Sequence, residues 1–235
     1  VGAVAGSYLP SILADYFGFS REGVNGGVAP NVIWSFYIGA MVFFGAILVT
    51  LIFAKEYPPE EYKLYHGEAK EEKQGLINIF HDFKAMPSTM KQLGLVQFFS
   101  WFAFFAMWSL ATPALTTHVF NAPVPVESAF DMADETSKSI FMMASKSYND
   151  AADLVGSYMG MYGLSSMAFA LLLTFYAAKR SINRKYIHMF SLFAGGLGFI
   201  SMYFINEPSQ LIYSFILIGI SWGSILSMPY AMLSR

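Results

Sequence analysis

The sequence has 235 residues, of which 55% are hydrophobic and 13% are charged, and its mean hydropathy is +0.46. A soluble domain carries roughly 25% charged residues, so this composition indicates a lipid environment. The net charge of −2 and the pI near 6.1 give no support for nucleic-acid binding. The absence of cysteine excludes disulfides, thiol catalysis and cysteine metal sites.

Five apolar stretches are long enough to cross a bilayer, because a transmembrane helix needs about 20 mostly apolar residues. None of the five contains Asp, Glu, Lys or Arg, which are costly near the bilayer centre. They run from Val32 to Ala54, Leu93 to Phe120, Val155 to Ala178, Tyr186 to Ile205 and Leu211 to Leu233. A sixth, Val1 to Phe17, begins at the first residue, and we interpret Val1 as a truncation point. No segment alternates in polarity like a barrel strand, so we predict an all-α integral membrane protein.

Basic residues gather in alternate loops, which predicts the orientation of the helices. One group follows the second apolar stretch and another follows the fourth: Lys55, Lys63, Lys70, Lys73, Lys84 and Lys91, then Lys179, Arg180, Arg184 and Lys185. Arg235 follows the last stretch on the same side. The opposite loops hold only Arg21, Lys138 and Lys146, and the longer of them is acidic. We therefore place the basic loops in the cytoplasm.

Two long loops separate the apolar stretches. The segment from Glu56 to Gln92 begins polar and becomes amphipathic, with apolar Leu76, Ile77, Ile79, Phe80 and Phe83 opposite Asn78, Asp82 and Lys84. We expect a helix there that lies along the membrane surface and ends before Pro87. Such a long linker indicates a join between two helical bundles. The outward segment from Asn121 to Leu154 is polar and contains proline, and its fold is not predicted.

Four passages together carry a family resemblance. They are QLGLVQFFSWFAFFAMWSLATPALTTHVF at Gln92 to Phe120, YNDAADLVG at Tyr148 to Gly156, GGLGFISMYFI at Gly195 to Ile205, and GISWGSILSMPYAMLS at Gly219 to Ser234. In this order they resemble sugar transporters of the major facilitator superfamily. More narrowly, the chain is similar to glycoside-pentoside-hexuronide:cation symporters and to sucrose and maltose proton symporters.

This resemblance implies a partial major facilitator-type helical bundle, covering about the fifth to tenth of twelve helices. Residues 1–54 would end the N-terminal bundle, 55–92 would form the central cytoplasmic loop, and 93–235 would begin the C-terminal bundle, whose last two helices would be missing. Arg184 and Lys185 match the basic residues of the family's cytoplasmic loop motif. Asn183 stands where that motif has glycine, and because asparagine tolerates positive φ, we expect a tight turn there.

A sugar site needs hydrogen-bonding groups beside aromatic rings that cover the flat C–H faces of the sugar. Gln97, Trp101 and Trp108 lie along one side of a predicted helix, and Gln97 is the only amide within the five stretches. We expect Gln97 to face a cavity, because an amide facing lipid would leave its donors and acceptor unpaired. The two tryptophans could equally be interfacial or packing residues. Pro113 predicts a kink in the same helix, with or without a functional role.

Further candidates for sugar binding lie in later stretches: Tyr162, after Tyr158 by one turn, and Trp222 and Tyr230, with Pro229 between them. The small residues nearby predict close helix packing: Gly156, Gly160 and Gly163, and Gly195, Gly196 and Gly198.

Cation coupling needs a shielded titratable group, and this chain is poor in them. The candidates are His118, Asp150 and Asp153, with Asp15 near the outer end of the first stretch, and we expect each to be solvated. We infer that the main coupling charges lie outside the chain.

No catalytic constellation and no phosphate-binding loop is present in the sequence, so we predict a secondary transporter and not an enzyme. The leading hypothesis is proton-coupled symport of a disaccharide or related glycoside by alternating access. A sodium-coupled relative, an exporter of another solute, and a membrane receptor or assembly partner without transport are the alternatives. We expect a monomer in the bacterial inner membrane, with a sugar and the lipid bilayer as partners, no nucleic acid, no metal, and no cofactor beyond a coupling proton or sodium ion.

Overall fold

A computed structural model describes residues 2–23, 27–55, 61 and 76–233. This part of the chain contains helices and no strand, so the predicted all-α fold is confirmed. The six long helices are α1 (Gly2–Phe17), α2 (Pro30–Phe53), α5 (Ser88–His118), α6 (Glu135–Ala177), α7 (Arg184–Ser201) and α8 (Leu211–Leu233). The shorter elements are α4 (Leu76–Ala85) and the 3₁₀ turns η2 (Glu127–Ala129), η3 (Met202–Phe204) and η4 (Pro208–Gln210).

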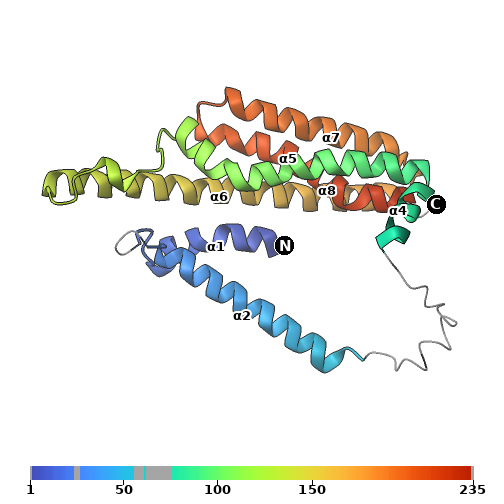
Figure 1. Cartoon of the computed structure of the whole chain (residues 1–235), viewed down its shortest axis with the longest axis horizontal. Coiled ribbons are helices and arrows are strands. Elements are labelled where there is room, and N and C mark those ends of the chain that lie inside the picture. Colours follow the sequence, from blue (N-terminus) through green and yellow to red (C-terminus); the bar gives the residue numbers. More distant parts are fainter. Residues whose placement is uncertain (1, 24–26, 56–60, 62–75, 234–235) are drawn as a thin grey trace.

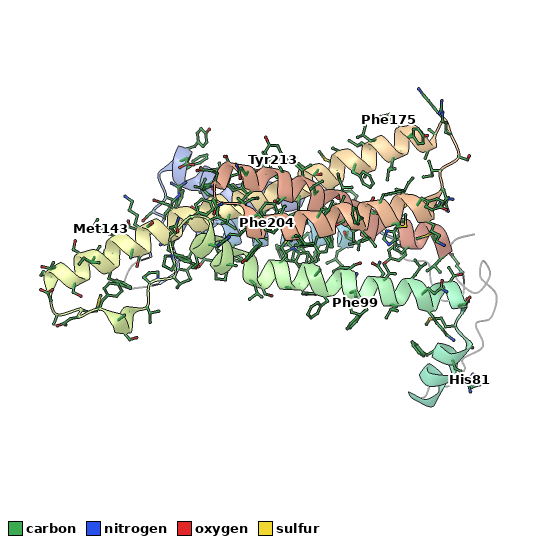
Figure 2. All side chains as sticks on the ribbon, turned by 90° about the horizontal axis from the view of Figure 1, so that it is seen from above. His81, Phe99, Met143, Phe175, Phe204 and Tyr213 are labelled. Carbon is green, nitrogen blue, oxygen red and sulfur yellow. The ribbon has the colours of Figure 1, made fainter. Side chains whose placement is uncertain are left out.

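Five of these helices are long and apolar enough to cross a membrane: α2, α5, α6, α7 with η3, and η4 with α8. Each of them overlaps one of the five stretches predicted from the sequence. Their side chains agree with a lipid surrounding, because large apolar groups cover the outside of the bundle. Figure 2 shows Phe99, Phe175 and Tyr213 pointing away from the helices, and all three are exposed. A soluble protein rarely exposes so much contiguous apolar surface, whereas lipid solvates it.

The helices α5 to α8 alternate in direction (Figure 1). One end of the bundle therefore holds the turn between α6 and α7, together with the start of α5 and the end of α8. We call it the basic end, because Lys179, Arg180, Arg184 and Lys185 belong to that turn or start α7. The other end holds the loops on either side of η2 and η3. The alternation that the charge pattern predicted is thus present, and the placement of the basic end in the cytoplasm stays a prediction.

Helix α8 is the centre of the bundle, since it packs along both α6 and α7. Its side chains Leu211, Phe215 and Ile218 are completely buried. Small residues permit this packing: a Cβ atom on Gly219 would lie 2.3 Å from a backbone oxygen of α6, and one on Gly195 would lie 2.5 Å from the Cβ of a serine in α8. Helix α5 packs on α6 and α8, and α1 packs on α6 and α2.

The close packing predicted at small residues is confirmed for four glycines and wrong for two. Added Cβ atoms would meet neighbours closely at Gly160, Gly163, Gly195 and Gly198. Gly156 would gain only an ordinary contact at 3.9 Å, and Gly196 has nothing within 4 Å. Gly156 and Gly196 therefore lie on faces of α6 and α7 that do not make the close helix contacts.

Helix α6 has 43 residues and begins 20 residues before Val155, where the predicted span starts. At about 1.5 Å per residue it is roughly 65 Å long, about twice the thickness of a hydrocarbon layer. Its start is fixed by Asp134, whose side chain accepts a hydrogen bond of 2.9 Å from the backbone N–H of Ser137. Residues 135–154 contain neither glycine nor proline, so the helix continues unbroken into the apolar span. More than half of the outer segment from Asn121 to Leu154 is therefore helix.

The predicted helix before Pro87 is present as α4, and it ends at Ala85. The predicted apolar face of α4 depends on residues 76–80, whose side chains lie outside the described residues. Residues 56–60 and 62–75 of the same loop also lie outside them. The position of α4 along a membrane surface stays a prediction. Helix α5 continues through Pro113 to His118.

Candidate functional site

Five aromatic side chains from three helices form one cluster in the middle of the bundle. Trp222 of α8 lies at its centre, with ring centroids 5.5 Å from Trp101 and 5.4 Å from Trp108, both at steep angles. It also lies 4.8 Å from Phe104 and 6.3 Å from Tyr162 of α6. We call this set the aromatic cluster: Trp101, Phe104, Trp108, Tyr162 and Trp222.

The sequence spacing explains why these rings meet. Trp101, Phe104 and Trp108 follow one another at intervals of three and four residues, which places them on one face of α5. That face meets α8 and α6, and Phe104 is the only ring of the cluster that is completely buried. Edge-to-face pairs like these are each stabilised by about 0.5–1.5 kcal/mol beyond burial. Four of the six predicted sugar-binding residues are thus brought together, and Phe104 was not among the predictions.

Gln97 lies one helical turn before Trp101 and joins α5 to α8. Its Nε2 donates a hydrogen bond of 3.2 Å to the carbonyl oxygen of Ile225. That carbonyl lies four residues before Pro229, which has no N–H to donate to it. The amide therefore replaces the missing backbone donor. Its Oε1 is buried and has no hydrogen-bond partner among the described residues, so one strong acceptor is left over near the aromatic cluster.

Tyr230 is not part of this cluster, because 69% of its surface is exposed. Eight residues along an α-helix correspond to about 80° of rotation and about 12 Å of rise, which carries Tyr230 away from the face of Trp222. Its role in sugar binding stays a prediction. Tyr158 of α6, one turn before Tyr162, packs at the edge of the buried core.

A second group of polar side chains lies near the other end of the bundle, where the loop after α1 meets α6 and α2. Nε of Arg21 lies 2.8 Å from Oδ2 of Asp153, and its Nη2 lies 2.7 Å from Oδ1 of Asp15. Asp153 also accepts a 3.0 Å hydrogen bond from Nδ2 of the buried Asn31. Asp150 stands 4.0 Å from the same guanidinium. We call these five residues the Arg21 network.

The Arg21 network ties three helices together through one cation. Burial lowers the pKa of Arg21, but hydrogen bonds and charge attraction from Asp15 and Asp153 outweigh it, so the pKa of Arg21 lies above its ordinary value. A cavity of about 540 Å³ opens beside the network, between Tyr8 and Ser11 of α1 and Leu154 of α6. Polar groups of both signs thus face a space that water or a small solute can enter.

The three predicted coupling residues have different surroundings. Asp153 retains only 14% of its side-chain exposure, so the expectation that it is solvated is wrong. Asp150 and Asp15 remain about half exposed, in agreement with the expectation. His118, at the end of α5, is exposed and its Nε2 lies 3.0 Å from the carbonyl oxygen of Tyr203.

His188 was not predicted as a site residue, yet it is the most shielded titratable group of these helices. It lies in the second turn of α7, is buried, and has its Nδ1 2.8 Å from Oγ of Ser224 in α8. Its Nε2 is buried without a hydrogen-bond partner in the part of the chain that the structure describes. The sequence signal was a histidine within an apolar stretch. Among the same described residues, no group of three or more His, Asp or Glu side chains is arranged to hold a metal ion.

A comparison with protein-family models matches the description "Major Facilitator Superfamily" over residues 1–235. The chain belongs to the major facilitator superfamily. Two further comparisons, with curated proteins and with solved structures, found no match. Proteins of this superfamily are membrane transporters and not enzymes. The helical bundle agrees with a partial major facilitator fold, as the sequence predicted.

The loop motif of this major facilitator chain lies at the basic end. Asn183 has φ of −86°, and its side chain accepts a hydrogen bond from the N–H of Tyr186, so it caps α7. The predicted tight turn at Asn183 does not use a positive φ, because Asn183 caps the helix with an extended backbone. The Arg184 guanidinium donates a hydrogen bond to the carbonyl oxygen of Ala231 in α8. Arg184 and Lys185 line a cavity of about 540 Å³.

Proposed function

We propose that this major facilitator chain takes part in proton-coupled symport of a disaccharide or related glycoside. The observation that carries the proposal is the aromatic cluster with the free Oε1 of Gln97 one turn away. Indole rings offer flat apolar surfaces for the C–H faces of a sugar, and the amide oxygen offers an acceptor for a hydroxyl group. Neither a purely lipid-facing stripe nor a uniform apolar core would place an unpaired amide oxygen there.

Alternating access is the second part of this proposal. The proposed halves are the pair α1 and α2 and the group α5 to α8, and α1 packs on α6 between them. The Arg21 network joins these halves near the loop after α1, at one end of the contact between α1 and α6. Rocking of one half against the other would have to break that network, and it would change the surroundings of Asp153 in each cycle. A carboxylate whose surroundings change in this way is suited to coupling.

The experiment measures uptake by proteoliposomes that contain the protein. We expect labelled maltose or sucrose to accumulate with an inward proton gradient and to leave again after an uncoupler is added. Trp222→Ala should weaken the apparent affinity roughly tenfold, corresponding to about 1.4 kcal/mol of lost stacking. Trp222→Phe should keep most of the wild-type affinity for the sugar. Trp34→Phe, in α2 outside the aromatic cluster, is the matched control and should behave as the wild type.

The same assay separates the alternatives. Accumulation driven by a sodium gradient but not by a proton gradient would replace proton coupling with sodium coupling. Glycoside binding without accumulation would indicate a receptor, and efflux against a gradient would indicate an exporter. No response to any member of a glycoside panel would contradict the proposal. Monomeric behaviour in detergent and a bacterial inner-membrane location are parts of the same proposal.

A further inference from the structure

His188 occupies a position where an apolar side chain would pack at lower cost. The residue is 5% exposed, and its ring lies between α7 and α8. A neutral imidazole has one N–H and one lone pair, on different nitrogens. The hydroxyl of Ser224 pairs with Nδ1 at 2.8 Å, as donor or as acceptor, and this leaves Nε2 with nothing to bind in the described structure.

An unpaired buried polar atom costs about 1–3 kcal/mol, and native proteins keep few of them. Phenylalanine or leucine at position 188 would avoid this cost. Packing therefore does not explain why position 188 carries an imidazole, whereas a ligand that binds Nε2 explains it. A ring nitrogen with a free lone pair binds either a metal ion or a proton. Among the described residues, no group of three or more His, Asp or Glu side chains is arranged to hold a metal ion, which favours a proton as the ligand.

The charged residues near His188 lie at the basic end of the bundle, beside a cavity. Helix α8 contains no Asp, Glu, Lys or Arg, and neither does α6 from Val155 onward. On α7 itself the nearest charges are Lys185, three residues earlier, and Arg184, one turn earlier, whose guanidinium is directed to the Ala231 carbonyl. Arg184 also lines the cavity of about 540 Å³ at the basic end, together with Thr89 and Met232. The cavity therefore reaches the turn of α7 that precedes His188, and Arg184 and His188 are separated by a rise of about 6 Å along the helix.

We propose that His188 is a proton-binding site that exchanges its proton with this cavity when α7 and α8 move apart. The Nε2 lone pair takes a proton from hydronium in the cavity and forms a new N–H bond, with water as the leaving group. The ring then carries one positive charge and two N–H groups, one of them held by Ser224. The reverse step returns the proton to water in the same cavity. Ser224 is a positioning residue, which holds Nδ1 so that Nε2 is the nitrogen that exchanges.

The role of this proton in coupling rests on the proposed symport, whereas its binding does not. The binding is measured first, by NMR of the intact protein in detergent micelles with ¹⁵N-labelled histidine. The His188 signals are assigned by their loss in His188→Asn. If that variant does not fold, they are the signals that remain unassigned after His66→Gln, His81→Gln and His118→Gln. We expect them to change from the neutral to the imidazolium form between about pH 8 and about pH 5. A ring that stays neutral throughout this range would overturn the proposal.

The coupling is measured by comparing two modes of transport. His188→Asn keeps an amide N–H near the place of Nδ1, so it can still pair with Ser224, but it cannot take a proton. We expect proton-driven accumulation to fall by roughly 5- to 150-fold, the usual range for coupling between two ligands, while equilibrium exchange of labelled glycoside stays near the wild-type rate. Ser191→Ala, which removes another buried polar group of α7, is the matched control and should keep both modes.

The two proposals fail in different ways. If no glycoside is transported by the wild type, the proposed function is wrong, and the NMR titration alone decides whether His188 binds a proton. If the wild type accumulates glycoside and His188→Asn accumulates it equally, the role of His188 in coupling is wrong while symport stands. Loss of exchange and accumulation together in His188→Asn, with a folded protein, would also contradict a specific role in coupling.

Discussion

Removal of the Arg21 guanidinium is the change whose cost can be worked out most directly from the structure. Asp153 would keep only the amide of Asn31 at 3.0 Å, with its side chain 14% exposed and with Asp15 and Asp150 close by. Unit charges 4 Å apart attract by about 4 kcal/mol at an effective dielectric constant of 20, and desolvation offsets part of this. We therefore expect Arg21→Ala to lower the free energy of unfolding by about 2 kcal/mol.

The assay is thermal unfolding of the purified protein in detergent, where about 2 kcal/mol corresponds to a fall in Tm of about 4–8 °C for a chain of this size. Asp153→Asn should cause a similar fall, and the double variant should cost little more than either single one, because both remove the same ion pair. Asp15→Asn is the control: its side chain is 53% exposed, and exposed pairs contribute about 0–1 kcal/mol.

Equal falls in Tm for Asp15→Asn and Asp153→Asn would refute this reasoning, and so would an additive double variant. A pH titration near neutrality is no substitute for these variants. The pKa of Arg21 is raised in the folded protein, so its contribution is fully present below the unfolded value, which lies far above neutral pH. The stabilisation would be lost only as the pH rises through that distant range.

Two further changes test the packing around α8. Gln97→Ala should cost about 1–2 kcal/mol of stability, because the Ile225 carbonyl loses its donor, and the cost should shrink when Pro229→Ala restores a backbone N–H. Equal costs in the two backgrounds, measured by thermal unfolding, would show that Gln97 does not cap this carbonyl. Gly219→Ala should lower Tm or prevent folding, since its Cβ would lie 2.3 Å from a backbone oxygen of α6, whereas Gly196→Ala meets nothing within 4 Å and should be neutral. Identical behaviour of the two alanine variants would contradict the close approach.

The membrane helices could be predicted from the sequence because a bilayer imposes a length and excludes charge, and both are visible in one dimension. The spans from Leu211 and from Tyr186 were therefore found almost to the residue. The start of α6 was not, because residues 135–154 mix polar and apolar side chains and contain no long apolar run. The cap at Asp134 and the absence of glycine and proline were the signals for a helix there.

The candidate site was predictable where its members share one helix face. Trp101 and Trp108 belong to such a face, and Trp222 joins them from α8. Contacts between distant segments could not be read from the sequence in the same way. The Arg21 network joins residues more than 120 positions apart, and the burial of His188 depends on how α7 meets Ser224. Such pairs are set by three-dimensional packing, which single-helix patterns do not encode.

Because α6 is long, a small tilt within the bilayer produces a larger displacement at its outer end. About 20 residues, or roughly 30 Å, extend beyond the apolar span on the same rigid rod that carries Asp153 and Tyr162. A tilt of about 10° at the aromatic cluster would displace the far tip by several ångströms more than it displaces the cluster itself. A spin label or fluorophore near Glu135 would therefore report on small rearrangements within the bilayer from a position in water, and an antibody fragment that holds this tip would restrain them.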